Sequence, residues 1–156
     1  MLLMPLKKPT RTIVCSLLLA ALPIASALAG LGGDAASVEA DRASLKGTLR
    51  VTPATSFAVH EISTANGMQV HEYLSAGGRV FAVSWRGPGI PDLRQMLASY
   101  YAPFAQAASA PHYNHHHLDI ETPQVVVQSS GHTRAFFGRA WVPALLPQNF
   151  SVDQIH

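Results

Sequence analysis

The stretch that decides the fold is residues 68–85, which read MQVHEYLSAGGRVFAVSW. Two runs with strand composition flank a turn of serine, alanine and glycine at residues 75–79. A third run of this kind, residues 57–63, precedes them. Asn66-Gly67, between residues 57–63 and the run that begins at Met68, is a strong hairpin signal, because a type I′ turn needs positive φ at both central residues. The pattern predicts a three-stranded antiparallel meander.

The first turn sets which side chains would share a face of this meander. A two-residue turn at Asn66-Gly67 pairs Glu61 with Glu72, so one face carries two carboxylates. The opposite face then holds two imidazoles and a phenol, from His60, His71 and Tyr73.

The second turn can be read in two ways. A two-residue Gly77-Gly78 turn places the apolar side chains of the third strand beside the glutamates, and a type I turn with Gly78 in a left-handed bulge position places them beside the histidines and tyrosine. These apolar residues are Phe81, Val83 and Trp85. We favour the bulged turn, because Ser75 suits its first position. It also keeps two carboxylates out of the core, where one would have to stay protonated.

An amphipathic helix is predicted after the meander. Pro91 and Asp92 suit its first turn, and Pro103 predicts its end near Tyr101. Its apolar residues are spaced i, i+3, i+4 and i+7, and they are Leu93, Met96, Leu97 and Tyr100. We expect this helix to cover the face that holds Phe81, Val83 and Trp85.

The remaining segments complete an α+β prediction. Residues 37–46 could form a short helix ended by Gly47 as a left-handed C-cap, and residues 48–52 an edge strand. Residues 124–128 and 133–142 are predicted to pair around a turn at residues 129–131. The expected fold is a small antiparallel sheet, made of the three-stranded meander and a C-terminal hairpin. It packs on one main helix, with a short N-terminal helix besides.

Residues 1–29 have the layout of a cleaved secretory signal. The apolar run at residues 13–22 is shorter than the roughly 20 residues that span a bilayer. An uncleaved anchor is the alternative, and Pro23 with the small residues after it argues against it. The charges before the run are Lys7, Lys8 and Arg11, and the small residues before the expected cleavage point are Ala27 and Ala29. We therefore predict an exported single domain over residues 30–156.

The composition of the exported part limits its partners. The leader holds three basic and no acidic residues, which leaves 8 basic against 9 acidic, a net charge of −1. This balance argues against nucleic acid and anionic membrane surfaces as partners. No second apolar run is long enough for a stable membrane span. The single cysteine, Cys15, lies inside the leader, so we expect neither lipidation nor a disulfide in the exported domain.

A His-rich loop near residues 105–121 is the clearest cluster of chemistry-bearing side chains. Neutral imidazoles bind zinc, copper or nickel, and nearby carboxylates can complete a shell. A dedicated site also needs fixed geometry and supporting hydrogen bonds, which a loop does not supply. We favour a solvated loop with incidental affinity, and keep a periplasmic metal-binding protein as an alternative. The candidate ligands are His112, His115, His116 and His117.

Catalytic residues are not predicted. Gly-x-Ser-x-Gly, His-Glu-x-x-His and a glycine-rich phosphate loop are all missing from the sequence. The pair Glu61 and Glu72 resembles an acid–base dyad, so a small hydrolase is a second alternative, although exposed carboxylates of this kind are usually solvated. A site formed by His60, His71 and Tyr73 is weighed against simple packing of these side chains, which we favour.

Several segments resemble one known family. They are residues 31–38, 59–62, 72–73, 80–85, 87–88, 91–93, 131–132 and 138–147. The family is one of exported Gram-negative proteins named only as domain of unknown function 2844, and the likeness covers nearly all of the exported part. It implies one periplasmic or secreted domain and assigns no catalytic residue, ligand or partner. The expected function is a non-catalytic binding or structural module that contacts another protein or a component of the cell envelope.

Overall fold

The structure is a computed structural model that describes residues 30–109 and 117–156. One seven-stranded sheet forms its centre, in the order β1-β2-β3-β4-β7-β6-β5, with every neighbouring pair antiparallel. The strands are β1 (Thr48–Pro53), β2 (Phe57–Ser63), β3 (Gln69–Ser75), β4 (Val80–Gly87), β5 (His117–Glu121), β6 (Val126–His132) and β7 (Ala135–Trp141). The helices are α1 (Ala35–Leu45), α2 (Leu93–Leu97) and α3 (Tyr101–Ala108), with 3₁₀ turns η1 (Ala98–Tyr100), η2 (Pro143–Leu145) and η3 (Val152–Gln154).

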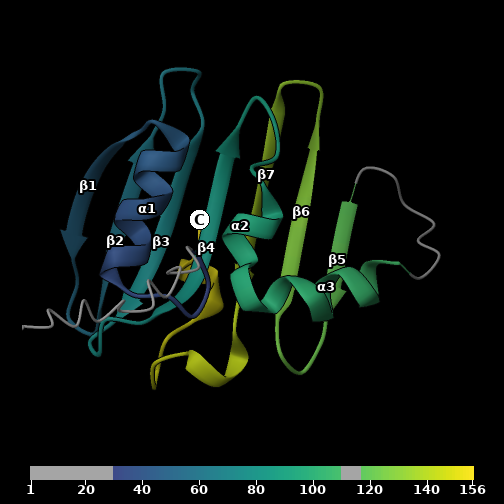
Figure 1. Cartoon of the computed structure of the whole chain (residues 1–156). Helices are drawn as coiled ribbons and strands as arrows, with labels where there is room; N and C mark the ends of the chain where they lie inside the picture. Colours follow the sequence, from purple (N-terminus) through teal and green to yellow (C-terminus); the bar gives the residue numbers. More distant parts are fainter. Residues whose placement is uncertain (1–29, 110–116) are drawn as a thin grey trace, which may run out of the picture.

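The expected meander and C-terminal hairpin are parts of one larger sheet. Strands β1 to β4 follow one another in space, and the segment from α2 to α3 then carries the chain across to β5 at the far edge (Figure 1). From there the chain returns through β6 to β7, which pairs with β4. The fold class is confirmed as α+β, but the sheet is larger than predicted. Strand β5 lies where we expected part of the His-rich loop.

Helices α1, α2 and α3 all pack on the same face of the sheet (Figure 1). Val38, Met96 and Phe104 contribute one side chain from each helix to this core. The opposite face holds a smaller core, in which Ile155 of the C-terminal segment packs with Tyr73, Phe81 and Trp141. The C-terminal segment therefore covers only part of that face. Within the described residues, no helix is both long and apolar enough to cross a membrane.

The first hairpin has a different turn from the one predicted. The Thr64 N–H donates to Met68 O at 2.9 Å and the Gly67 N–H donates to Thr64 O at 3.1 Å, which closes a three-residue loop with Gly67 at φ 84°. The Thr64 hydroxyl and the Asn66 side chain both accept from the Met68 N–H and stabilise this loop. The pairing consequently shifts by one residue. His60 faces Glu72, and the predicted pairing of Glu61 with Glu72 is wrong.

The second hairpin has the predicted bulged turn, but the strands slip beyond it. Gly78 has φ 74° and donates to Ser75 O at 2.8 Å, as expected. A further irregularity after Tyr73 then pairs this residue with Ala82 and Leu74 with Val80. A one-residue slip exchanges the faces of the following residues.

This slip changes which side chains share the helix-covered face. Val83 and Trp85 lie under the helices, whereas Phe81 lies on the other face beside Tyr73, with ring centroids 6.2 Å apart. Glu72 points under the helices and is 0% exposed. The predicted division of the faces is therefore correct for His60, Glu61, Val83 and Trp85, and wrong for His71, Tyr73, Phe81 and Glu72.

The helices also differ from the prediction in detail. The helix expected to end near Tyr101 is interrupted at Ala98, with φ 48°, and resumes as α3. Pro103 falls in the first turn of α3, where its missing N–H leaves no hydrogen bond unmade. Helix α1 and edge strand β1 are confirmed, but Lys46, with φ 52°, occupies the left-handed C-cap position expected for Gly47. The C-terminal hairpin turns at residues 133–134, a few residues later than expected.

Candidate functional site

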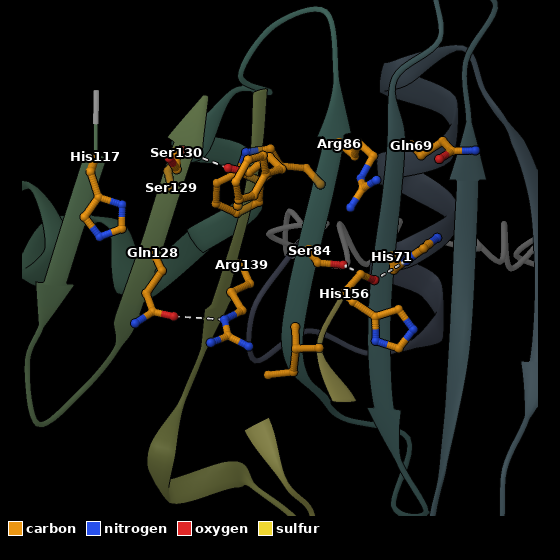
Figure 2. A pocket seen from close by; sticks show the side chains of 14 residues that line it. Gln69, His71, Ser84, Arg86, His117, Gln128, Ser129, Ser130, Arg139 and His156 are labelled. Atoms are coloured by element: carbon orange, nitrogen blue, oxygen red, sulfur yellow. Dashed lines mark hydrogen bonds between the residues drawn. The ribbon is translucent and has the colours of Figure 1, made fainter. Parts of the chain in front are cut away.

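A cavity of about 510 Å³ lies on the face of the sheet opposite the helices (Figure 2). Its volume falls in the range of about 300–1,000 Å³ that is typical of small-molecule sites. Strands β3, β4, β7 and β6 form its floor, with His117 of β5 at one side.

Two rows of side chains cross the strands on this floor. Alternate residues of a strand point to the same face of the sheet. Residues paired across neighbouring strands also share a face, so they form rows that cross the strands. The first row consists of His71, Ser84, Arg139 and Gln128. The second row consists of Gln69, Arg86, Phe137, Ser130 and His117.

The C-terminal segment forms one wall of the cavity. The main-chain oxygen of His156 accepts hydrogen bonds from Tyr73 Oη and Ser84 Oγ, both at 3.0 Å, and lies 2.7 Å from His71 Nδ1. The His156 N–H donates in turn to Tyr73 Oη at 3.0 Å. Because Ile155 also packs into the smaller core, this wall is held by both apolar and polar contacts.

Two arginine side chains, Arg86 and Arg139, line the cavity. Arg139 is held in place, since Nε donates to Gln128 Oε1 and Nη1 donates to Val152 O, each at 2.9 Å. Arg86 is exposed, and its side chain makes no hydrogen bond or ion pair within residues 30–109 and 117–156. None of the described residues that line the cavity is Asp or Glu. In the first row, Glu61 and Asp119 occupy the outer positions on either side of the cavity.

A second cluster of titratable groups lies on the helix-covered face, away from this cavity. Asp41 of α1 and Glu72 of β3 are both 0% exposed, and Gln95 Nε2 donates to Asp41 Oδ1 at 2.5 Å. Burial, together with the neighbouring Asp41 charge, raises the pKa of Glu72 to about 9. Glu72 therefore holds a proton at neutral pH. Burial also raises the pKa of Asp41 and lowers that of His60, which pairs with Glu72 across the strands.

The sheet separates the two carboxylates of the hydrolase alternative and divides the candidate site of two histidines and a tyrosine. Glu61 and Glu72 lie on opposite faces, so they do not form the carboxylate dyad of the hydrolase alternative. His71 and Tyr73 do lie together, at the wall of the cavity. His60 lies on the other face with Glu72, because cross-strand partners share a face.

The predicted metal ligands are mostly outside the described residues. His112, His115 and His116 lie between the two described ranges, 30–109 and 117–156, whereas His117 lies on β5 and lines the cavity. In the part of the chain that the structure describes, no group of three His, Cys, Asp or Glu side chains could hold a metal ion. A metal site at the four histidines stays a prediction.

Sequence reasoning missed the residues that give the cavity its charge. Arg86, Gln128 and Arg139 were not singled out, although each stands two residues from another polar or exposed side chain in its strand. This i, i+2 alternation in four strands was the available signal for an open polar face. This alternation does not predict that β4 pairs with β7, and that pairing brings the two arginines onto the floor of one cavity.

The comparisons with known proteins give a family and no closer relative. No curated protein and no solved structure matches the chain. Residues 27–155 match the model of the family described as protein of unknown function (DUF2844). This match spans most of the chain and all but one of the described residues. The chain therefore belongs to the DUF2844 family.

Proposed function

We propose that this protein is an exported, non-catalytic binding module that holds an anionic ligand in the cavity on the open face of the sheet. One observation carries the proposal. Two guanidinium groups, Arg86 and Arg139, stand in a cavity of about 510 Å³ that none of the described Asp or Glu residues lines. Arginine forks bind carboxylates and phosphates through paired, charge-assisted hydrogen bonds.

The two arginines suit different parts of such a task. Arg139 is oriented by Gln128 and by the main chain of Val152 before any ligand arrives, so little side-chain entropy is lost when it binds. Arg86 is exposed and without a partner in the described ranges, so it can adjust to the ligand. A preorganised cation beside a mobile one favours an anion with some freedom of shape.

The absence of catalysis is supported by how the reactive side chains are used. Ser84 and His71 are neighbours across β3 and β4 and could form a nucleophile and base. Both instead make their hydrogen bonds to the main-chain oxygen of His156. The other candidate acids, Asp41 and Glu72, lie on the far side of the sheet under the helices.

Export is supported by the leader and is tested directly. The full chain is expressed in a Gram-negative host, the periplasmic fraction is isolated, and the mass of the intact protein is measured. We expect a form that begins at Gly30, because Ala27 and Ala29 satisfy the small-residue rule for cleavage. A full-length protein found only in the cytoplasm would contradict export.

The anion site is tested on the same exported protein by thermal unfolding in increasing phosphate or citrate at constant ionic strength. A ligand that binds only the folded state raises the free energy of unfolding, by about 2.7 kcal/mol at a ligand concentration of a hundred times Kd, and Tm rises as a result. We expect this rise to be lost in Arg86→Gln and retained in Arg79→Gln. Arg79 is the matched control because it is exposed in the β3–β4 turn, outside the cavity lining. Equal rises in both variants, or none in the parent protein, would refute the site.

A further inference from the structure

We propose that the anionic ligand is an acidic saccharide, a short chain of sugar rings that carry carboxylates. It would lie across the strands over the two rows of side chains. This inference rests on the proposed function, and it adds the chemical class and orientation of the ligand. Three features of the cavity lead to it: an exposed aromatic ring, side chains suited to hydroxyl groups, and a floor of inner strands.

The aromatic ring is that of Phe137. Its side chain is 52% exposed, and it is the only one of the three large exposed hydrophobic residues of the described chain that lines the cavity. In the second row it lies between Arg86 and Ser130. A sugar ring has an apolar face formed by its C–H groups and a rim of hydroxyls. An exposed flat ring among polar side chains is complementary to that combination.

The polar groups around Phe137 match the rim and the charge of such a ring. Gln69 supplies an amide and His117 an imidazole at the two ends of the second row (Figure 2). Neither side chain makes a hydrogen bond within the described residues. Amide groups both donate and accept, as sugar hydroxyls do. Arg86, adjacent to Phe137, is placed to bind a carboxylate on the same sugar whose ring covers the phenyl group.

The shape of the floor indicates how the ligand lies. The second row crosses five strands, from Gln69 on β3 to His117 on β5. Neighbouring strands are about 4.8 Å apart, so the row is about 19 Å long. An elongated ligand therefore makes most contacts when it runs across the strands.

Other ligand classes fit this floor less well. A peptide that binds by strand addition needs an open sheet edge, whereas β4, β7 and β6 are inner strands with partners on both sides. Nucleic acid calls for a strongly basic surface, and the exported part of the chain carries a net charge of −1. A membrane surface calls for several exposed apolar side chains, and Phe137 is the only one at the cavity.

The test measures binding of hexagalacturonate to the exported protein by calorimetry. Its methyl ester is the matched ligand, since it keeps the sugar rings and removes the charges. Polyglutamate keeps the carboxylates and removes the rings. We expect hexagalacturonate to bind at least about tenfold more tightly than either, because the methyl ester loses the contact with the arginine and polyglutamate loses the contact with the aromatic ring.

Two variants separate the contributions of charge and ring. Arg86→Gln is expected to weaken hexagalacturonate binding about 10- to 100-fold, and Phe137→Ala about tenfold. The controls are Arg79→Gln and Val51→Ala, which change an exposed cation and an exposed apolar side chain outside the cavity and should alter affinity less than about twofold. Circular dichroism and Tm confirm that each variant is folded.

The outcomes distinguish this inference from the proposed function. Equal binding of polyglutamate, or an unchanged affinity in Phe137→Ala, overturns the saccharide and leaves an anion site. Equal binding of the methyl ester overturns the role of Arg86. If hexagalacturonate does not bind while phosphate or citrate raises Tm through Arg86, the saccharide is wrong and the anion site stands. If no anion binds at all, both proposals fail.

Discussion

Replacing Glu72 by Gln is expected to stabilise the protein against unfolding, and increasingly so as the pH rises. Glu72 is 0% exposed beside Asp41, and its pKa is raised from 4.5 to about 9. In the unfolded chain the same carboxyl titrates near its ordinary pKa. Between these two values the folded protein keeps a proton that the unfolded chain releases.

The sign and size follow from proton linkage. A carboxyl whose pKa is raised on folding contributes its full stability below the unfolded pKa, here 4.5, and loses it progressively until about pH 9. Each pH unit within this window lowers the free energy of unfolding by about 1.4 kcal/mol. Glutamine cannot ionise, so the variant lacks this loss. From pH 6 to pH 8 the difference in unfolding free energy between variant and parent should grow by roughly 2–3 kcal/mol in favour of the variant.

Urea unfolding at pH 5, 6, 7 and 8, followed by circular dichroism, measures this difference. The matched control is Glu61→Gln, which removes one carboxyl from the neighbouring strand on the opposite, partly exposed face. Its difference from the parent should stay nearly constant with pH. A constant difference for Glu72→Gln as well, or a variant less stable than the parent at pH 8, would refute the buried, protonated carboxyl.

Three further predictions concern packing, backbone conformation and metal. Gly138→Ala should destabilise the protein by about 1–3 kcal/mol in urea unfolding, because a Cβ would lie 2.3 Å from Trp85 Cζ2, while Gly89→Ala meets no atom within 4 Å and should be near neutral. Lys46→Gly should raise the free energy of unfolding by about 1 kcal/mol, since Lys46 has φ 52° and glycine adopts this conformation without strain. Lys46→Ala is the control and should not stabilise the protein. Stabilisation by Lys46→Ala would argue against the left-handed cap. Zinc, copper and nickel calorimetry on the purified protein should show only weak, incidental affinity. A submicromolar Kd would instead establish the metal-binding alternative, provided that it is lost when the four candidate ligands are replaced by Ala. These ligands are His112, His115, His116 and His117.

Local signals in the sequence were sufficient for several elements of the fold. The meander over residues 57–85, the Gly78 turn, the short N-terminal helix and the C-terminal hairpin all follow from strand composition, turn residues and caps. These features depend on residues close together in the chain. The family resemblance likewise rested on short motifs and is confirmed by the match over residues 27–155.

Which side chains lie on which face of the sheet depends on one-residue shifts in strand pairing, and the composition of the strands does not predict these shifts. Thr64 and Asn66 close a three-residue loop where a two-residue turn was equally compatible with the Asn-Gly signal. A slip after Tyr73 then placed Val83 and Trp85 beside Glu72 and Val70 and left Phe81 on the opposite face. The cost of burying an ionised carboxyl favoured a register that keeps both glutamates out of the core. Glu72 is nevertheless buried beside Asp41, and its raised pKa keeps it protonated there.

Residues close together in the chain define the strand and turn chemistry and the short motifs of the family. The tertiary structure alone decided that β7 pairs with β4, and hence that Arg86 and Arg139 share a cavity floor. The physical reason is that cross-strand neighbours are set by long-range hydrogen bonding and core packing, for which neither arginine carries a local signal. The candidate binding site is thus a property of the sheet order, and each strand contributes only one or two of its side chains.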